Sequence, residues 1–296
     1  MDDKQKKAEF ASGQEVKRKR VLFTTRLRAR IRRDPQAFRI YSLLRILVII
    51  SLVRRIYLRD FESAAVCVLA LLLLLVPAFT EWRFRVEIPA MMQITIYLFI
   101  YAAEILGELN QFYVRIPGWD TMLHTINGFI CAAIGFSLIY VLNRGSSRIS
   151  LSPFYLTLVG FTFSMTIGVI WEFIECFADL FFQMDMQKDF IVQRFSSVTL
   201  DPSNSQIPVH VNHITKTIIE TKSGKTYTVY GGYLDIGLLD TMKDLFVNFI
   251  GALVFSIFGY SYLKHGDQGK PSVAEEMMLK VEDDEEADAP ADTEGG

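Results

Sequence analysis

Acidic side chains and one histidine recur inside long apolar stretches of the sequence, and their spacing within each stretch is helical. Intervals of three or four residues bring the members of a set onto one face of a helix. An ionisable group inside an apolar span is unfavourable unless it is paired or solvated, which makes each one a functional candidate. The sets are Glu104 and Glu108; Asp120 and His124; Glu172, Glu175 and Asp179; and Asp240, Asp244 and Asn248.

These residue types suit a hard divalent cation such as Mg, Mn or Zn, whose identity the sequence leaves open. So many carboxylates cannot all be ionised side by side without a cation or shared protons. A bound ion could activate water or clamp a phosphate. We predict metal ligands at Asp120, His124, Glu172, Glu175, Asp240 and Asp244, catalytic roles for Glu172, Glu175 and Asp244, and site-lining positions for Glu104, Glu108, Asp179 and Asn248.

The same residues also have purely structural interpretations. Asp120 and Asp240 could cap helices that face water, and His124 could make a polar contact within a helix bundle. Glu104 and Glu108 could reach the membrane interface. The basic residue that we expect beside the acidic sets is Arg115, which could pair with one of their carboxylates, the interpretation that we favour, or hold a substrate anion. For His210 and His213, which lie outside the apolar stretches, we expect exposed or structural positions.

The apolar residues that surround these groups are clustered into membrane-length segments. They make up 51% of the 296 residues. A stretch of about 20 apolar residues can cross a hydrocarbon core roughly 30 Å thick. The composition argues against a soluble enzyme, a secreted disulfide scaffold and a disordered chain. We predict an all-α polytopic membrane protein with six transmembrane helices, near 40–58, 62–79, 88–109, 121–142, 153–182 and 241–263.

The polar stretches between and beside these spans complete the predicted domain organisation. Residues 183–240 are too polar to lie in lipid and form an extracytoplasmic insert. Within it, 214–221 and 225–230 are rich in β-branched residues and flank Lys222-Ser223-Gly224, which predicts a β-hairpin. We divide the chain into a basic cytoplasmic arm (1–39), helices one to five (40–182), the insert (183–240), helix six (241–263) and an acidic, disordered cytoplasmic tail (264–296).

The distribution of Lys and Arg sets the expected orientation. With both termini inside, 20 of them fall on the inner side and 10 on the outer side. This bias favours cytoplasmic termini in a bacterial plasma membrane. The basic arm has 13 Lys and Arg within residues 1–40, and beside a span it suits anionic lipid better than nucleic acid. The acidic sets then all lie in the outer half of the bilayer, around a cavity open to the outside.

Three segments resemble one family, the YjdF-type bacterial inner-membrane proteins, which have no assigned function. They are Gly118-Trp119-Asp120-Thr121-Met122-Leu123-His124, Trp171-Glu172-Phe173-Ile174-Glu175, and Leu239-Asp240-Thr241-Met242-Lys243-Asp244 with Asn248 and Gly251. The last segment also resembles the final helix of VanZ-like proteins, which are associated with the cell envelope and glycopeptide resistance. The resemblance covers about 85–263. It departs at Leu234-Asp235-Ile236-Gly237-Leu238, where the family has Gln-Gly-Asp and Trp.

Two functions therefore stand side by side. The first is a membrane protein whose acidic site acts, with metal help, on an envelope lipid or lipid-linked phosphate. The second is a non-catalytic carrier or binding protein in which the carboxylates take up cations or protons. A bound divalent ion with open coordination positions would favour the first, and a continuous polar path to the cytoplasmic side would favour the second.

Overall fold

The computed structural model describes residues 34–84, 86–144, 150–265 and 272–281. Most of the predicted basic arm lies outside these ranges. Six helices in the described ranges are long and apolar enough to cross a membrane: Pro35–Tyr57, Phe61–Phe84, Ala90–Leu109, Trp119–Asn143, Pro153–Phe182 and Leu238–His265. The chain is thus a mostly helical multi-pass membrane protein, as predicted. It divides into two compact units, one of Met1–Ile116 with Gly269–Gly296, the other of Pro117–Gln268.

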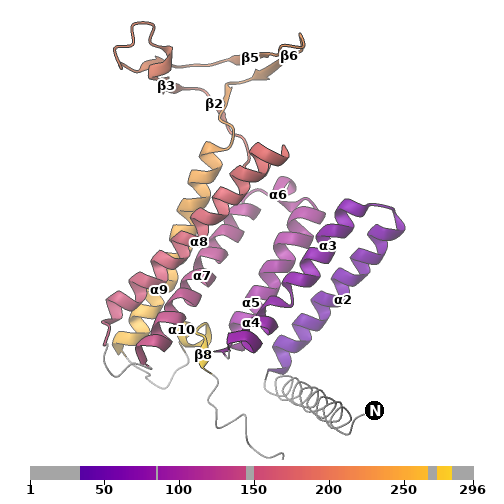
Figure 1. Cartoon of the computed structure of the whole chain (residues 1–296), viewed down its shortest axis with the longest axis vertical. Helices are drawn as coiled ribbons and strands as arrows, with labels where there is room; N and C mark the ends of the chain where they lie inside the picture. Colours follow the sequence, from indigo (N-terminus) through magenta and orange to yellow (C-terminus); the bar gives the residue numbers. More distant parts are fainter. Residues whose placement is uncertain (1–33, 85, 145–149, 266–271, 282–296) are drawn as a thin grey trace, which may run out of the picture. The chain divides into compact units, whose positions relative to one another are not determined.

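The first unit holds three of the membrane-length helices. They are α2 (Pro35–Tyr57), α3 (Phe61–Leu73) continued by α4 (Val76–Phe84), and α5 (Ala90–Ile100) continued by the π-helix η1 (Tyr101–Leu109) and the short α6 (Phe112–Arg115). In Figure 1, α2, α3 and α5 run alongside one another. Their shared core includes Val48, Cys67, Ala70, Leu74 and Tyr97.

An arginine is held in place at the connection between α2 and α3. The guanidinium of Arg55 lies 2.8 Å from the carboxylate of Asp60 and also donates to the backbone oxygen of Leu109. Hydrogen bonds from Ser63, together with the Arg55 charge, hold the pKa of Asp60 below its ordinary value. Arg55 is therefore bound into the end of this helix bundle.

Part of the tail that the sequence analysis placed in a disordered segment is folded in the structure. Residues Val273–Glu276 form helix α10, and Lys280–Val281 form strand β8. Strand β8 pairs antiparallel with β1 (Val86–Glu87), which follows α4. Ala274 and Met277 are almost completely buried. Apolar side chains among the acidic ones thus fix this segment to the first unit.

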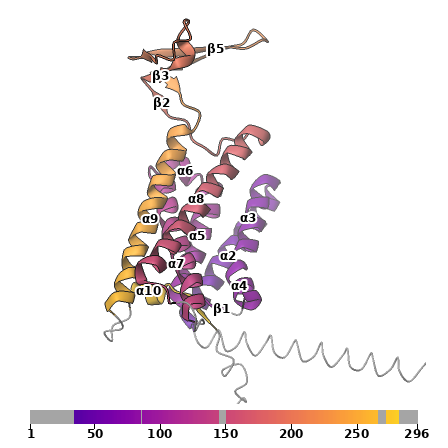
Figure 2. The same ribbon diagram turned by 60° about the vertical axis from the view of Figure 1, so that its left-hand side comes forward.

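The second unit is built on three helices that pack pairwise against one another: α7 (Trp119–Arg144), α8 (Pro153–Phe182) and α9 (Leu238–His265). They run side by side in both views (Figure 1, Figure 2). Two glycines permit a very close approach of α7 and α9. A Cβ at Gly251 would overlap the carbonyl oxygen of Thr125, and one at Gly128 would overlap that of Asn248.

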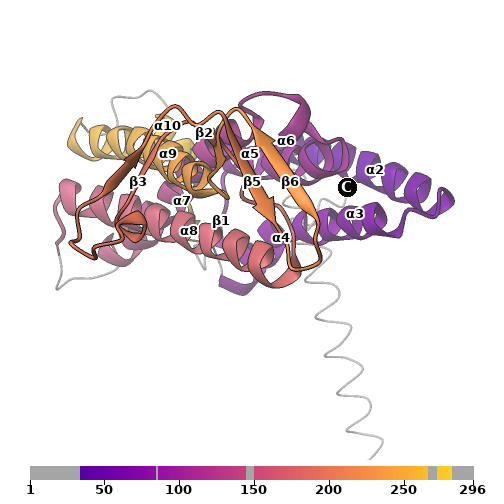
Figure 3. The same cartoon turned by 90° about the horizontal axis from the view of Figure 1, so that it is seen from above.

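The insert between α8 and α9 consists of short antiparallel strand pairs. Strand β2 (Ile191–Val192) pairs with β7 (Tyr233–Leu234), and β3 (Phe195–Ser197) pairs with β4 (Val209–Val211); the one-turn 3₁₀ helix η2 (Val198–Leu200) follows β3. The predicted hairpin is present as β5 (Lys216–Glu220) and β6 (Thr226–Tyr230), with its turn at Lys222-Ser223-Gly224. The two strands of the hairpin lie next to each other in Figure 3. The β2–β7 and β3–β4 pairs were not predicted.

Candidate functional site

Two similar turns bring carboxylates to the start of α7 and of α9. Gly118 (φ +81°) precedes α7 and Gly237 (φ +89°) precedes α9, and both adopt left-handed backbone that favours glycine. Asp120 and Asp240 then lie in the first turns of their helices, where the positive end of the helix dipole stabilises a negative charge. One turn later, α7 presents His124 and α9 presents Asp244.

Three of the predicted metal ligands converge between α7 and α9. One possible ligand atom from each of Asp120, His124 and Asp244 lies within 4.8 Å of the other two. The Nε2 atom of His124 is 3.4 Å from Asp120 Oδ1 and 4.0 Å from Asp244 Oδ2. Ligand bonds of about 2.0–2.6 Å allow two ligands of one ion to lie up to about 5 Å apart. The three side chains therefore fit a single divalent cation.

Glu172 of α8 lies on the other side of the imidazole ring. Its Oε1 atom is 3.9 Å from His124 Nδ1. A metal-binding histidine ordinarily donates its second ring nitrogen to a carboxylate or carbonyl, which fixes the tautomer and the ring orientation. Glu172, predicted as a metal ligand, is placed to orient His124, while Nε2 faces Asp120 and Asp244.

Two buried oxygen atoms at this position lack hydrogen-bond partners in the part of the chain that the structure describes. They are Glu172 Oε2 and Asp244 Oδ1. Asp244 is 1% exposed and Glu172 is 4% exposed. Asp244 Oδ1 has an ion-pair partner, the ammonium of Lys243 at 3.4 Å. A buried carboxylate oxygen without a partner is strongly unfavourable, so Glu172 Oε2 is the atom that points to a proton or another ligand at this place.

A lysine that was not predicted from the sequence lies beside Asp120, His124 and Asp244. The ammonium of Lys243 is 2.7 Å from Asp240 Oδ1, 3.4 Å from Asp244 Oδ1 and 3.6 Å from Asp120 Oδ2. Arg115, which we expected there, instead donates to Gln111 within its own helical turn. The spacing of Lys243, three residues after Asp240, was the available signal for this ion pair.

Asp240 and Asp179 connect the helices to the insert. Asp240 Oδ2 accepts from the backbone N–H of Lys188. The two oxygens of Asp179 accept from the N–H groups of Met186 and Gln187, at 2.6 and 2.9 Å. Asp240 was predicted as a metal ligand and Asp179 as a site-lining residue. Both carboxylates hold the segment that leaves α8.

The loop before Asp240, where the chain departs from the family pattern, has a related role. Asp235 accepts from the N–H of Phe190 through Oδ1 and from that of Leu239 through Oδ2. It thereby caps the start of α9 and fastens the segment 185–190 to it. The aromatic ring of Phe190 lies over Lys243, with the ammonium 5.6 Å from the ring centroid.

The remaining predicted residues are distributed differently. Glu175 is buried in α8, and its Oε1 accepts from Trp171 Nε1 at 2.8 Å. Glu104 and Glu108 belong to the first unit, in the π-helix η1, where Glu104 is half-buried and Glu108 is exposed. The i→i+5 bonding of such a helix is uncommon and occurs often at functional sites.

Asn248 forms a separate polar layer one turn further along α9. Its amide nitrogen donates to the carbonyl of Ser164, and its Oδ1 accepts from Asn127. Beyond this layer the rings of Phe136 and Phe255 are in edge-on contact and almost completely buried. The buried hydroxyls of Ser137 and Thr157 donate to backbone oxygens of their own helices. The ionisable residues of the site therefore all lie on the insert side of Asn248.

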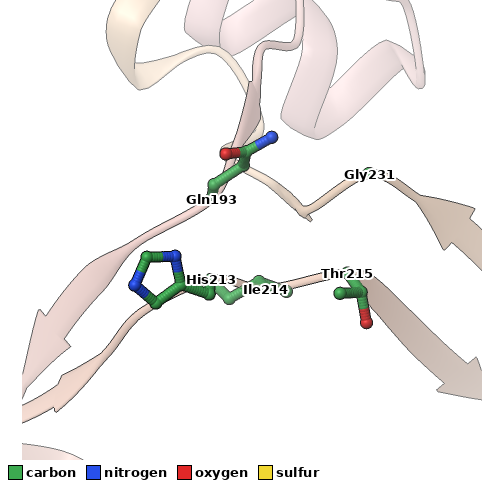
Figure 4. Close-up of a pocket in the computed structure, with 5 residues that line it drawn as sticks. All are labelled: Gln193, His213, Ile214, Thr215 and Gly231. Carbon is green, nitrogen blue, oxygen red and sulfur yellow. The ribbon is translucent and has the colours of Figure 1, made fainter.

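The insert contains a pocket of its own, shown in Figure 4. It is lined by Gln193, His213, Ile214, Thr215 and Gly231. His213 is the only ionisable side chain among these five, so the lining does not supply a second charged group. His210 lies elsewhere in the insert and pairs with Ser196 across β3 and β4. Both histidines are exposed, which is one of the two positions expected for them.

Comparison with known protein families identifies a match over most of the chain. A family described as "Predicted membrane protein (DUF2238)" matches residues 39–265. The chain belongs to this family. The match begins within the first membrane-length helix of the DUF2238 chain and covers the other five, together with both turns that carry Asp120 and Asp240. It is consistent with the resemblance to YjdF-type proteins. No curated protein and no solved structure matches the chain.

Proposed function

We propose that this membrane protein binds a divalent cation through Asp120, His124 and Asp244 and uses it on the phosphate group of an envelope lipid or lipid-linked molecule. The observation that carries the proposal is the convergence of three ligand atoms within 4.8 Å, with His124 and Asp244 buried and Asp120 half-buried. The buried Glu172 Oε2 atom, which has no hydrogen-bond partner among the described residues, supports it independently. Mg, Mn and Zn all accept carboxylate oxygen and imidazole nitrogen.

The surroundings of the three ligands support action on a substrate. Three protein ligands leave coordination positions for water and for a phosphate oxygen. The bound ion would supply Lewis-acid activation of either one. Glu172, 3.9 Å from Nδ1, would favour the tautomer of His124 that presents Nε2 to the ion. Glu175, with one oxygen fixed by Trp171, would serve as the acceptor for the proton of an attacking water.

The packing beyond Asn248 supports this function over the carrier alternative. A carrier needs a polar path to the opposite membrane face. In this protein, the described side chains beyond Asn248 are close-packed around Phe136 and Phe255. We place the site in the outer half of a bacterial plasma membrane, with both termini cytoplasmic, on the strength of the Lys and Arg distribution. The basic arm then lies against anionic lipid.

Metal content and activity together test the proposal. Protein purified in detergent without chelator should carry about one divalent ion per chain, measured by plasma mass spectrometry. Asp244→Asn and His124→Ala should lose the ion, whereas Glu220→Gln, an exposed carboxylate on β5, should retain it. Wild-type protein without any ion, even after dialysis against Mg, Mn and Zn, would overturn the metal assignment.

The catalytic part needs a second measurement. In vesicles that contain a polyprenyl diphosphate, the metal-loaded protein should release inorganic phosphate. Glu175→Gln should lose this activity while keeping the ion, because it removes a proton acceptor but no ligand. Ion binding without phosphate release, together with movement of the ion across the vesicle membrane, would favour the carrier.

A further inference from the structure

Lys243 contacts two of the three proposed metal ligands. Each of these two carboxylates directs one oxygen towards His124 Nε2. The oxygen is Oδ1 in Asp120 and Oδ2 in Asp244. Their other oxygens, Asp120 Oδ2 and Asp244 Oδ1, face the ammonium of Lys243 at 3.6 and 3.4 Å. The lysine and an ion at His124 can therefore occupy opposite sides of the same two carboxylates at the same time.

The position of Lys243 is held by groups outside the metal-ligand set. Asp240 Oδ1, at 2.7 Å, is its nearest partner. Asp240 is itself fixed by the N–H of Lys188, and the Phe190 ring covers the ammonium. The side chain of Lys243 is 35% exposed, compared with 2% for Asp244. The ammonium is thus anchored at the rim of the site, beside ligands that lie deeper.

Lys243 lowers the negative charge of this group. Asp120, Asp240 and Asp244 carry three negative charges, and an ionised Glu172 beside His124 adds a fourth. A metal-bound histidine is neutral. The ammonium of Lys243 therefore reduces the formal charge of the group from −4 to −3 and opposes any cation bound beside it in a low-dielectric position.

We infer that Lys243 is a built-in counter-ion that tunes the charge selectivity of the site, weakening the binding of trivalent cations more than that of divalent ones. The inference rests on the proposed metal site. Its physical basis is Coulomb repulsion between the ammonium and the bound ion, which increases in proportion to the charge of the ion. Removing the lysine charge should therefore strengthen trivalent binding more than divalent binding.

The test compares Mn²⁺ and Tb³⁺ affinity in detergent-solubilised full-length protein. Lys243→Met should bind Mn²⁺ about 10-fold more tightly than wild type and Tb³⁺ about 30-fold more tightly, since the logarithm of the gain scales with ion charge. Electron paramagnetic resonance reports free Mn²⁺, and sensitised luminescence reports bound Tb³⁺. Lys243→Arg keeps the charge and should stay near wild type. Lys188→Met removes a nearby exposed charge that pairs with Asp185 and should change neither affinity.

Each outcome separates the two proposals. Equal gains in affinity for both ions would indicate steric release and overturn the charge-selectivity role. Unchanged or weakened binding in Lys243→Met would overturn it as well. In each case the metal site itself stands if wild type binds Mn²⁺. Binding in Lys243→Met but not in wild type would support the counter-ion role in its strongest form. Absence of binding in both proteins would overturn the metal site and this inference together. Gel filtration and a thermal melt confirm that Lys243→Met is folded.

Discussion

The Nδ1 atom of His124 on α7 lies 3.9 Å from the Oε1 atom of Glu172 on α8, two residues that are 48 positions apart. This contact joins the helix that carries two of the candidate metal ligands to a helix that carries none of them. The Nε2 atom on the other side of the ring faces Asp120 and Asp244. Under the proposed metal site, the tautomer of the central ligand would therefore depend on a residue that is not itself a ligand.

Glu172→Gln should lower the affinity of the site for the ion without abolishing binding. Loss of the carboxylate beside a metal-binding histidine typically lowers affinity about 10–100-fold. The substitution removes the charge that fixes the His124 tautomer and leaves the three ligands in place. Isothermal titration of the chelator-treated protein with Mn²⁺ or Zn²⁺ measures the change. Glu175→Gln, whose carboxylate contacts Trp171 instead, is the matched control and should bind almost as wild type does. A larger loss in Glu175→Gln than in Glu172→Gln would contradict this assignment.

Gly251→Val should destabilise the second unit. A Cβ at this position overlaps the carbonyl oxygen of Thr125 on α7, and backbone cannot move aside as a side chain can. Overpacking of this kind costs about 1–3 kcal/mol or more. The temperature at which the solubilised protein aggregates should fall. Gly259→Ala is the control, because its Cβ meets only the edge of the Phe136 ring, at 3.3 Å. Similar melting temperatures for the two variants would show that the close approach of α7 and α9 is wrong.

Met277→Asp should loosen the folded part of the tail from the first unit. Met277 is 1% exposed, and a buried unpaired charge is strongly unfavourable. Limited proteolysis should cut this variant within 272–281 faster than wild type. Glu276→Ala changes an exposed neighbour and should be cut at the wild-type rate. Identical cleavage of all three proteins would mean that the segment is not held in place.

The orientation can be measured with topology reporters. An alkaline phosphatase inserted near Gly224 should be active, because we place the insert outside the cytoplasm. A fluorescent protein fused after Lys264 should fluoresce, because we place the tail inside. The opposite pattern would move the candidate site to the cytoplasmic side, and an extracytoplasmic lipid-linked substrate would then be untenable.

The sequence alone determined the features that arise from neighbouring residues. Six apolar segments became six membrane-length helices because a backbone in hydrocarbon must satisfy its own hydrogen bonds locally. The turn at Lys222-Ser223-Gly224 formed because Gly224 tolerates a positive φ. The spacing of Asp120 and His124, and of Asp240 and Asp244, fixed which side chains share a helical face.

The tertiary structure decided what each of those faces meets. Glu172 and Asp240 are as regularly spaced in the sequence as the candidate ligands are, but they have different partners. Glu172 lies beside the imidazole of His124, whereas Asp240 holds Lys243 and the insert. The glycine contacts between α7 and α9 permit the short distance between these helices, and α8 packs against both. Helical spacing specifies a direction around one axis only. The distances between ligands on different helices depend on how the axes pack, which is a non-local property of the chain.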